Sequence, residues 1–296
     1  MPPSTYSQGH STAVTANHII RTAEHDGAFL LPYLKPHYRI LDLGCGPGTI
    51  TTGFATYVPQ GSVTGVDLSP EVLDQARDIL SRQAPPTSKR GDISFELGNV
   101  LEGLPFPDAS FDAIFTNQTI IHISEPVKAL KELKRVCKPG GLVACREGDF
   151  PFTFYPALEG MQLFQKYLWL MVHGSVSPSN PSARFLTPDP NRPYNSPHPS
   201  NHRSGSLVHV WAREAGFDPE KMVKGASVES GSTKEKRDVF ADNMLARFES
   251  AGWREKWAKL GASEEEIETV VRDLKKWKED VDSWYAITNA ETVCFA

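Results

Sequence analysis

The segment with the clearest chemical meaning is Leu41-Asp42-Leu43-Gly44-Cys45-Gly46-Pro47-Gly48-Thr49, in which three glycines alternate with other residues after an acid. Glycine adopts positive φ angles and lets a ligand come close to the backbone. A dinucleotide-binding loop has the pattern G-x-G-x-x-G and seats a pyrophosphate on a helix N-terminus. Here the pattern is D-x-G-x-G-x-G, and a carboxylate at Asp42 would repel a pyrophosphate but attract an ammonium group. The pattern therefore disfavours a nicotinamide dehydrogenase and indicates a nucleoside with a cationic amino-acid tail, such as S-adenosylmethionine.

Two further segments suit the same ligand. Val66-Asp67-Leu68-Ser69 puts a carboxylate at the end of a predicted strand, where it can accept hydrogen bonds from both ribose hydroxyls. Gly98-Asn99-Val100 follows the next strand. The Asn99 side chain can accept from the adenine amino group while the N–H of Val100 donates to a ring nitrogen, although Asn99 is nearly as well explained as an ordinary turn residue.

The elements that position these residues alternate between strands and helices. Strands are predicted at 39–43, 62–67, 93–97, 111–116, 142–146, 222–228 and 284–295. Helices are predicted at 17–34, 49–57, 69–80, 124–138, 156–173 and 206–217, and helical structure over 234–283. Such alternation predicts an α/β fold with a parallel sheet covered on both faces. The carboxyl ends of parallel strands meet at one edge, so the three segments above are expected to share a crevice.

The domain organisation follows from where this pattern is interrupted. We predict N-terminal lid helices at 1–35, a cofactor-binding core at 36–150, a lid insertion with a Pro-rich loop at 151–205, the rest of the core sheet at 206–231 and 284–296, and a helical insertion at 232–283.

Composition narrows the class of protein. The chain of 296 residues has 31 basic and 36 acidic residues, and this acidic balance argues against a nucleic-acid partner. No apolar run is long enough to span a membrane, and the N-terminus does not resemble a secretory or mitochondrial leader, so we expect a cytoplasmic protein. The four cysteines are scattered and form no CxxC pattern or His/Cys cluster, so no zinc site or other metal is expected. The expected partner is a small-molecule acceptor, and the expected state is a monomer or homodimer.

The chain resembles the class I S-adenosylmethionine-dependent methyltransferases of the ubiquinone/menaquinone-biosynthesis type. The resemblance rests on LDLGCGPGT (41–49), VTGVDLSP (63–70), LEGLPFPDASFDAIFTNQTIIHI (101–123) and ALKELKRVCKPGGLV (129–143), and covers roughly residues 38–146. It implies a Rossmann-like, doubly wound, seven-stranded sheet of order 3-2-1-4-5-7-6 with the last strand antiparallel, and helical insertions that form a lid.

The resemblance also implies the residues that bind the cofactor. Gly44 and Gly46 line its cradle above Asp42, Asp67 binds the ribose, and Leu68 packs on the adenine. The remaining positions are Cys45 and Gly48 of the loop, Asn99 (where many relatives have Asp) with Val100, Asn117 and Gln118 beside the methionine moiety, and Tyr6 with His10 in an N-terminal lid that could equally be a frayed terminus.

Other residues leave alternatives open. A general base helps only if the acceptor arrives protonated, and His122 is the candidate we favour ahead of Glu147 and Asp149, although His122 is also explained as a packing residue. Cys45 is interpreted as structural rather than nucleophilic. Arg146 and Glu147 are expected to form a surface ion pair. The aromatic residues of 150–169 could line an apolar acceptor pocket or form the core of the lid.

The sequence thus predicts an enzyme that transfers a methyl group from S-adenosylmethionine to a small, apolar or aromatic molecule. The alternative is a catalytically weak methyltransferase-like regulator or scaffold that binds the cofactor.

Overall fold

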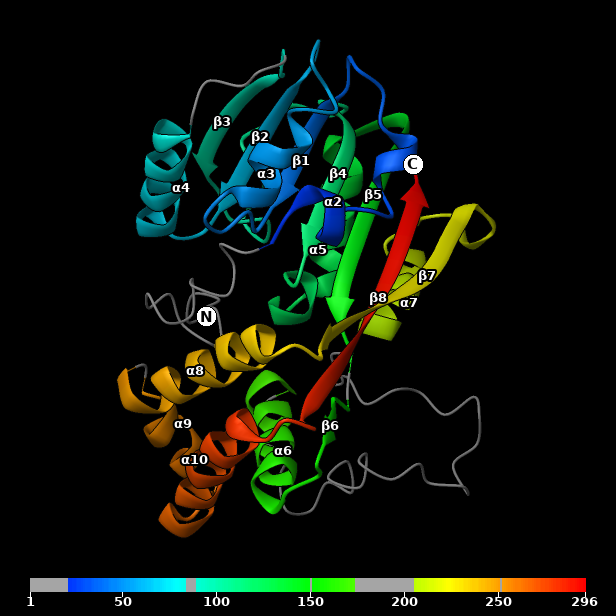
Figure 1. The fold of residues 1–296 in the computed structure, drawn as a ribbon. Coiled ribbons are helices and arrows are strands. Elements are labelled where there is room, and N and C mark those ends of the chain that lie inside the picture. Colours follow the sequence, from blue (N-terminus) through cyan, green and yellow to red (C-terminus); the bar gives the residue numbers. More distant parts are fainter. Residues whose placement is uncertain (1–20, 84–88, 150, 174–204, 251) are drawn as a thin grey trace. The chain divides into compact units, whose positions relative to one another are not determined.

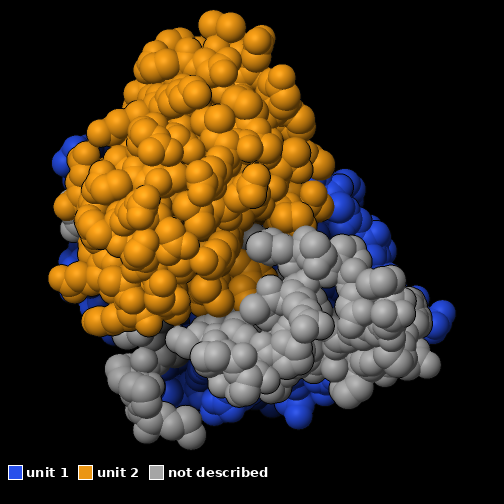
Figure 2. All heavy atoms as spheres, turned by 90° about the horizontal axis from the view of Figure 1, so that it is seen from below, with its two compact units in different colours: residues 1–148, 205–227, 289–296 blue, residues 149–204, 228–288 orange. Residues whose placement is uncertain are grey.

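The computed structural model describes residues 21–83, 89–149, 151–173, 205–250 and 252–296 (Figure 1). The chain divides into two compact units, coloured separately in Figure 2. Unit 1 consists of residues 1–148, 205–227 and 289–296, and unit 2 of residues 149–204 and 228–288. Tyr6 and His10 lie outside the described residues, so their predicted role is a matter for experiment.

Unit 1 is built on a sheet whose order follows the prediction. Five parallel strands run in the order β3-β2-β1-β4-β5, and β8 pairs antiparallel with β5 through Leu142↔Phe295 to Gly148↔Asn289. The strand β7 pairs with β8. The strands are β1 (Arg39–Leu43), β2 (Ser62–Asp67), β3 (Asp92–Leu97), β4 (Phe111–Asn117), β5 (Cys137–Gly148), β7 (Met222–Gly231) and β8 (Trp284–Phe295). The short β6 (Thr153–Tyr155), which was not predicted, pairs with the first residues of β8 in unit 2. Because β6 is an additional strand, β7 and β8 correspond to the sixth and seventh strands of the predicted order.

The helices of unit 1 cover both faces of this sheet because successive strand residues point to opposite sides. Leu41 and Ile114 pack in one cluster with the apolar faces of α5 (Pro126–Val136) and α7 (Val208–Glu214). Their neighbours Ile40 and Phe115 pack in another with Phe54, whose ring contacts Phe115 edge-on at a centroid distance of 4.9 Å. The other elements are α3 (Thr49–Phe54), α4 (Pro70–Arg82), and the 3₁₀ helices η2 (Ile120–His122), η4 (Gly205–Leu207) and η5 (Pro219–Lys221).

The prediction of one N-terminal helix over 17–34 is wrong for the residues after Asp26. The described part holds only α2 (Ala23–Asp26) and the 3₁₀ helix η1 (Leu31–Tyr33). Gly27 caps α2, and Pro32 lies inside η1. Both residues oppose a continuous α-helix, and the apolar periodicity instead reflects contacts that the separate turns make with the sheet.

Unit 2 has an aromatic core formed by α6 (Glu159–His173), α8 (Lys234–Ser250), α9 (Trp253–Lys259) and α10 (Glu264–Glu279). A capping box begins α10: the Ser263 hydroxyl accepts from the N–H of Glu266, and the Glu266 carboxylate accepts from the N–H of Ser263. Phe154, Phe164 and Tyr167 are buried among these helices, so they belong to the core of unit 2. Of the two alternatives for the aromatic residues, core packing is therefore the correct one for these three.

No helix within the described ranges is both long and apolar enough to cross a membrane.

Candidate active site

The glycine loop between β1 and α3 turns sharply at the end of the sheet. Gly44, Gly46 and Gly48 all have positive φ, at +72°, +53° and +76°. The N–H groups of Gly44 and Cys45 both donate to the carbonyl of Val66, at 2.7 and 3.1 Å, which ties the loop to the end of β2. A Cβ at Gly44 would collide with the Thr119 side chain. The loop therefore requires glycine there for its dihedral angles and for the close approach of the segment after β4.

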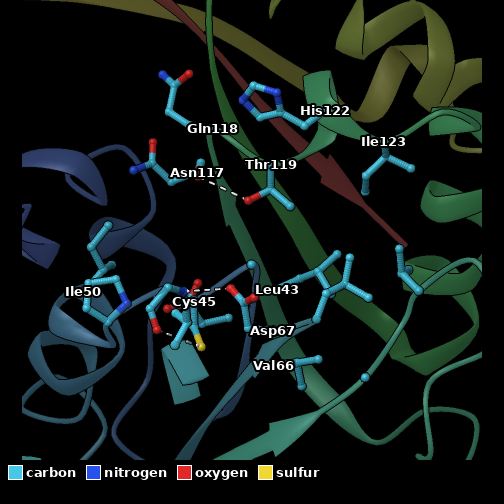
Figure 3. A pocket seen from close by; sticks show the side chains of 18 of the residues that line it. Leu43, Cys45, Ile50, Val66, Asp67, Asn117, Gln118, Thr119, His122 and Ile123 are labelled. Carbon is cyan, nitrogen blue, oxygen red and sulfur yellow. Dashed lines mark hydrogen bonds between the residues drawn. The ribbon is translucent and has the colours of Figure 1, made fainter. Parts of the chain in front are cut away.

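Asp67 holds the two sides of the crevice together. One carboxylate oxygen accepts from the N–H of Gly46 at 3.0 Å and the other from the N–H of Ser69 at 3.1 Å, while Ser69 caps α4. A carboxylate oxygen can accept two hydrogen bonds, so each retains a lone pair for a ligand hydroxyl. Asp67 lines a pocket at this end of the sheet (Figure 3).

Asp42 lies beneath the loop, as predicted, and is only 2% exposed. Its carboxylate accepts from the Thr51 hydroxyl at 2.6 Å. Burial raises the pKa of Asp42 to about 7, the Thr51 hydrogen bond opposes that rise, and the charge of Asp67 adds to it. A cation bound nearby would favour the ionised carboxylate, so the arrangement suits a positively charged ligand.

The segment after β3 supplies the far end of the same pocket. Asn99 and Val100 of this segment line it, and so does Leu68, which follows β2 and is 43% exposed although apolar. The Asn99 side-chain oxygen accepts from the N–H of Leu101 at 3.0 Å. Asn99 thus has the turn role that the sequence left open, and its position in the pocket allows a ligand role as well.

Asn117 and Gln118 line the pocket at the end of β4. Asn117 is 6% exposed; its side-chain oxygen accepts from Nη1 of Arg146 at 3.1 Å, while its Nδ2 has no hydrogen-bond partner among the described residues. Gln118 has φ of +55°, which is uncommon outside glycine. Its side chain donates to Asn289 at 2.7 Å and accepts from the N–H of Gly148 at 3.1 Å, which holds this conformation.

The expectation that Arg146 and Glu147 form a surface ion pair is wrong. Both are buried, at 1% and 0% exposure. The Arg146 side chain pairs with Asp26 at 3.1 Å. The Glu147 side chain accepts from the N–H groups of Ile120 and Thr119, at 2.9 and 3.1 Å. Successive strand residues point to opposite faces, so the two side chains diverge.

Glu147 serves the turn that carries His122. Burial raises the pKa of Glu147 to about 7, against the opposing effect of hydrogen bonds from the backbone of Ile120, Thr119 and Ile121. His122 lies in η2 and lines the pocket, whereas Glu147 and Asp149 are absent from the described lining residues. Of the three general-base candidates, His122 is therefore the one with access to a ligand.

Cys45 lines the pocket and is buried. Burial, followed by the charges of Asp42 and Asp67, raises the pKa of its thiol well above the usual value. A protonated thiol is a poor nucleophile, which favours the structural interpretation.

The pocket brings together most residues that the sequence singled out. Asp42, Gly44, Cys45, Gly46, Asp67, Leu68, Asn99, Val100, Asn117, Gln118 and His122 all line it, and Gly48, which caps α3, does not. The sequence reasoning missed the lining residues Arg21, Leu43, Pro47, Thr49, Ile50, Val66, Val72, Gly98, Leu101, Thr119 and Ile123. Most of these flank a predicted residue and could have been found by adjacency, whereas nothing in the sequence singles out Arg21.

Comparisons with known proteins agree with this geometry. A family model described as a methyltransferase domain matches residues 41–145. The chain is 35% identical to a protein of Aspergillus luteorubrus named probable methyltransferase ltbC, over 98% of this chain and 96% of that protein. It is also 35% identical to a demethylmenaquinone methyltransferase of Symbiobacterium thermophilum, over 41% of this chain and 47% of that protein.

A solved structure extends the likeness to the fold. The crystal structure of a protein from Bacillus halodurans C-125, described there as a methyltransferase, has a TM-score of 0.53 at 17% identity and covers 91% of this chain and 98% of that one. The predicted Rossmann-like α/β architecture is thereby confirmed.

Proposed function

Because the chain belongs to the class I S-adenosylmethionine-dependent methyltransferases, with S-adenosylmethionine as cofactor, we propose that it methylates a small, apolar or aromatic molecule in the pocket of unit 1. The observation that carries this proposal is that His122 lines the same pocket as the glycine loop and Asp67. A proton acceptor and a cofactor cradle then open onto one space.

The residues present fit the cofactor. The strand order β3-β2-β1-β4 sets Asn99, Asp67, the glycine loop and Asn117 in a row along one edge of the sheet. We assign adenine to the end near Asn99 and Leu68, the ribose hydroxyls to Asp67, and the methionine moiety to the end near Asn117 and Gln118. Nδ2 of Asn117 has no hydrogen-bond partner in the described ranges, which supports a polar ligand there, and the buried carboxyl of Asp42 supports a cationic one.

The chemistry asks little of the protein beyond orientation. When bound, the cofactor supplies a methyl group on a positively charged sulfur, and the leaving group is a neutral thioether. The pocket residues hold the two reactants in line and exclude water. When the lone pair of a hydroxyl or amine acceptor forms the bond to the methyl carbon, His122 accepts the proton that the acceptor loses. An acceptor without such a proton does not require a base.

The lining of the pocket in unit 1 indicates the class of acceptor. The aromatic residues Phe154, Phe164 and Tyr167 are packed in the core of unit 2, so they do not support an acceptor pocket. The apolar lining residues Leu101 and Ile123 belong to the segments that flank Asn99 and His122, and they favour an apolar acceptor.

We propose similarity to the ubiquinone/menaquinone-biosynthesis type only for the cofactor-binding part of the chain. The relative that carries that name matches 41% of the chain, whereas the full-length relative carries no acceptor in its name. We further propose that Tyr6 contributes to cofactor binding and that the protein acts as a monomer or homodimer in the cytoplasm.

The test is an acceptor screen with methyl-deuterated S-adenosylmethionine, read by mass spectrometry. Labelled methyl ethers, formed from hydroxyl-bearing aromatic acceptors, are expected. With such an acceptor, His122→Gln should lower kcat by roughly 100-fold or more, the range for a lost general base, and leave cofactor binding unchanged. The exposed His37→Gln is the matched control. An unaltered kcat in His122→Gln would exclude His122 as the base, and labelling only of large polymers would exclude the small-molecule acceptor.

A further inference from the structure

We infer that Arg146 is a positioning residue of the cofactor pocket, which fixes the amide of Asn117 as a hydrogen-bond donor toward the carboxylate tail of the cofactor. The inference rests on the proposed function, since it assigns a specific contact within the same site.

Arg146 is a buried cation with partners on four segments. Its side chain is 1% exposed. Nη1 donates to Asp26 and to Asn117, each at 3.1 Å, and Nε donates to Ser227 at 3.3 Å and lies 3.7 Å from the carboxylate of Glu291. The carboxylates of Asp26 and Glu291 compensate the buried charge, so the side chain is held in place from several directions.

The contact with Arg146 decides which way the Asn117 amide faces. A guanidinium has donors and no acceptor, so the atom of Asn117 that faces it must be the oxygen. Nδ2 is then the remaining polar atom of the side chain, and it is buried without a partner in the described part of the chain. Because Asn117 lines the pocket, a ligand acceptor is the group that can satisfy this N–H.

The position in the sheet indicates which ligand atom this is. Asn117 ends β4, whereas Asp67 ends β2, with β1 between them. A ligand whose ribose lies on Asp67 therefore extends its amino-acid tail toward Asn117. The tail carries the one anionic group of the cofactor, and a donor backed by a guanidinium is suited to a carboxylate.

The same network reaches a second part of the pocket. One oxygen of Asp26 accepts from Arg146 and the other accepts from the N–H of Thr22 at 3.1 Å. Thr22 follows Arg21, which lines the pocket. A continuous series of hydrogen bonds thus joins the backbone beside Arg21 to the amide of Asn117, two segments that are far apart in the sequence.

The test compares two nucleosides that differ in the tail. S-adenosylhomocysteine has the amino-acid carboxylate, and 5′-methylthioadenosine lacks it. For Arg146→Met we expect the affinity for S-adenosylhomocysteine to fall about tenfold, the equivalent of one such hydrogen bond, with less than a threefold change for 5′-methylthioadenosine. Arg135→Met is the matched control. Arg135 also makes several ion pairs and hydrogen bonds, but its partners Glu132, Asp108, Phe106 and Leu104 are not lining residues, whereas Arg146 contacts the lining residue Asn117.

Asn117→Asp gives a second measurement should Arg146→Met fail to fold. It keeps an oxygen for Arg146 and replaces the donor with an anionic oxygen, so the same selective loss of S-adenosylhomocysteine is expected. An equal loss for both nucleosides, or no loss, would overturn the inference and leave the proposed function intact. If the unsubstituted protein binds neither nucleoside, the proposed function fails and the inference fails with it.

Discussion

Replacement of Asp67 by alanine tests the assignment of the ribose to this carboxylate. Each carboxylate oxygen has one lone pair in use, for Gly46 and for Ser69, and one lone pair open to the pocket. Loss of two hydrogen bonds from ribose hydroxyls to a charged acceptor should cost about 2–3 kcal/mol of binding, or a 30- to 150-fold rise in Kd. The N–H groups of Gly46 and Ser69 also lose their acceptor, which should lower the free energy of unfolding by roughly 1 kcal/mol.

The assay is calorimetric titration with S-adenosylhomocysteine, with thermal unfolding measured in parallel. Asp74→Ala is the matched control, since Asp74 is an exposed acid that pairs with Arg77 on α4. A 2′-deoxy analogue of the nucleoside should bind the unsubstituted protein more weakly, and Asp67→Ala should discriminate less between the analogue and its parent. A Kd for Asp67→Ala within threefold of the original value, in a folded protein, would refute the ribose assignment.

Three further predictions concern charge, burial and backbone shape. The affinity for S-adenosylmethionine should rise between pH 6 and 8 as Asp42, with a pKa of about 7, ionises beside a sulfonium whose charge does not change, and Asp42→Asn should remove that rise. The ligand-free protein should lose thermal stability as pH increases from about 4.5 to 7, because buried Glu147 keeps its proton where the unfolded chain has released it, and Glu147→Gln should reduce the loss. Gly44→Ala should weaken cofactor binding at least tenfold, whereas Gly140→Ala, with a similar φ of +75° and open space around it, should cost about 1–2 kcal/mol of stability and no affinity.

Each of these has an outcome that counts against it. A pH-independent affinity would mean that no cation lies near Asp42. Equal pH profiles of unfolding for Glu147→Gln and the parent protein would mean that the carboxyl is not shielded from water. If Gly140→Ala weakens cofactor binding as much as Gly44→Ala does, the effect of both substitutions is general instability and not a local change in the loop.

The cofactor half of the site could be predicted because its determinants are local. The glycine loop, Asp67 and Asn99 each follow directly from a strand, and parallel strands bring their carboxyl ends together whatever the rest of the chain does. The order of the strands came from the family resemblance, since periodicity alone cannot supply it.

The surroundings of the site could not be predicted because they depend on distant partners. Arg146 is buried through Asp26, 120 residues away in the sequence, and two adjacent opposite charges suggested an exposed pair instead. The break in the N-terminal helix has the same origin, because packing against the sheet imitates the apolar spacing of a helix. The sequence alone could not decide whether Phe154 and Phe164 line a pocket or belong to a core, because their burial depends on the helices of unit 2 that pack around them.

The buried thiol of Cys45 has a consequence for an enzyme that handles an alkylating reagent. A thiolate readily attacks the methyl group of a sulfonium, so a cysteine in the wall of the binding site is an obvious unintended target. Proton retention by Cys45 withholds the reactive electron pair, so the wall does not compete with the acceptor for the methyl group. Burial is the main cause of this proton retention, and the two acids that attract the reagent add to it, so the charges that favour cofactor binding also help to suppress the side reaction.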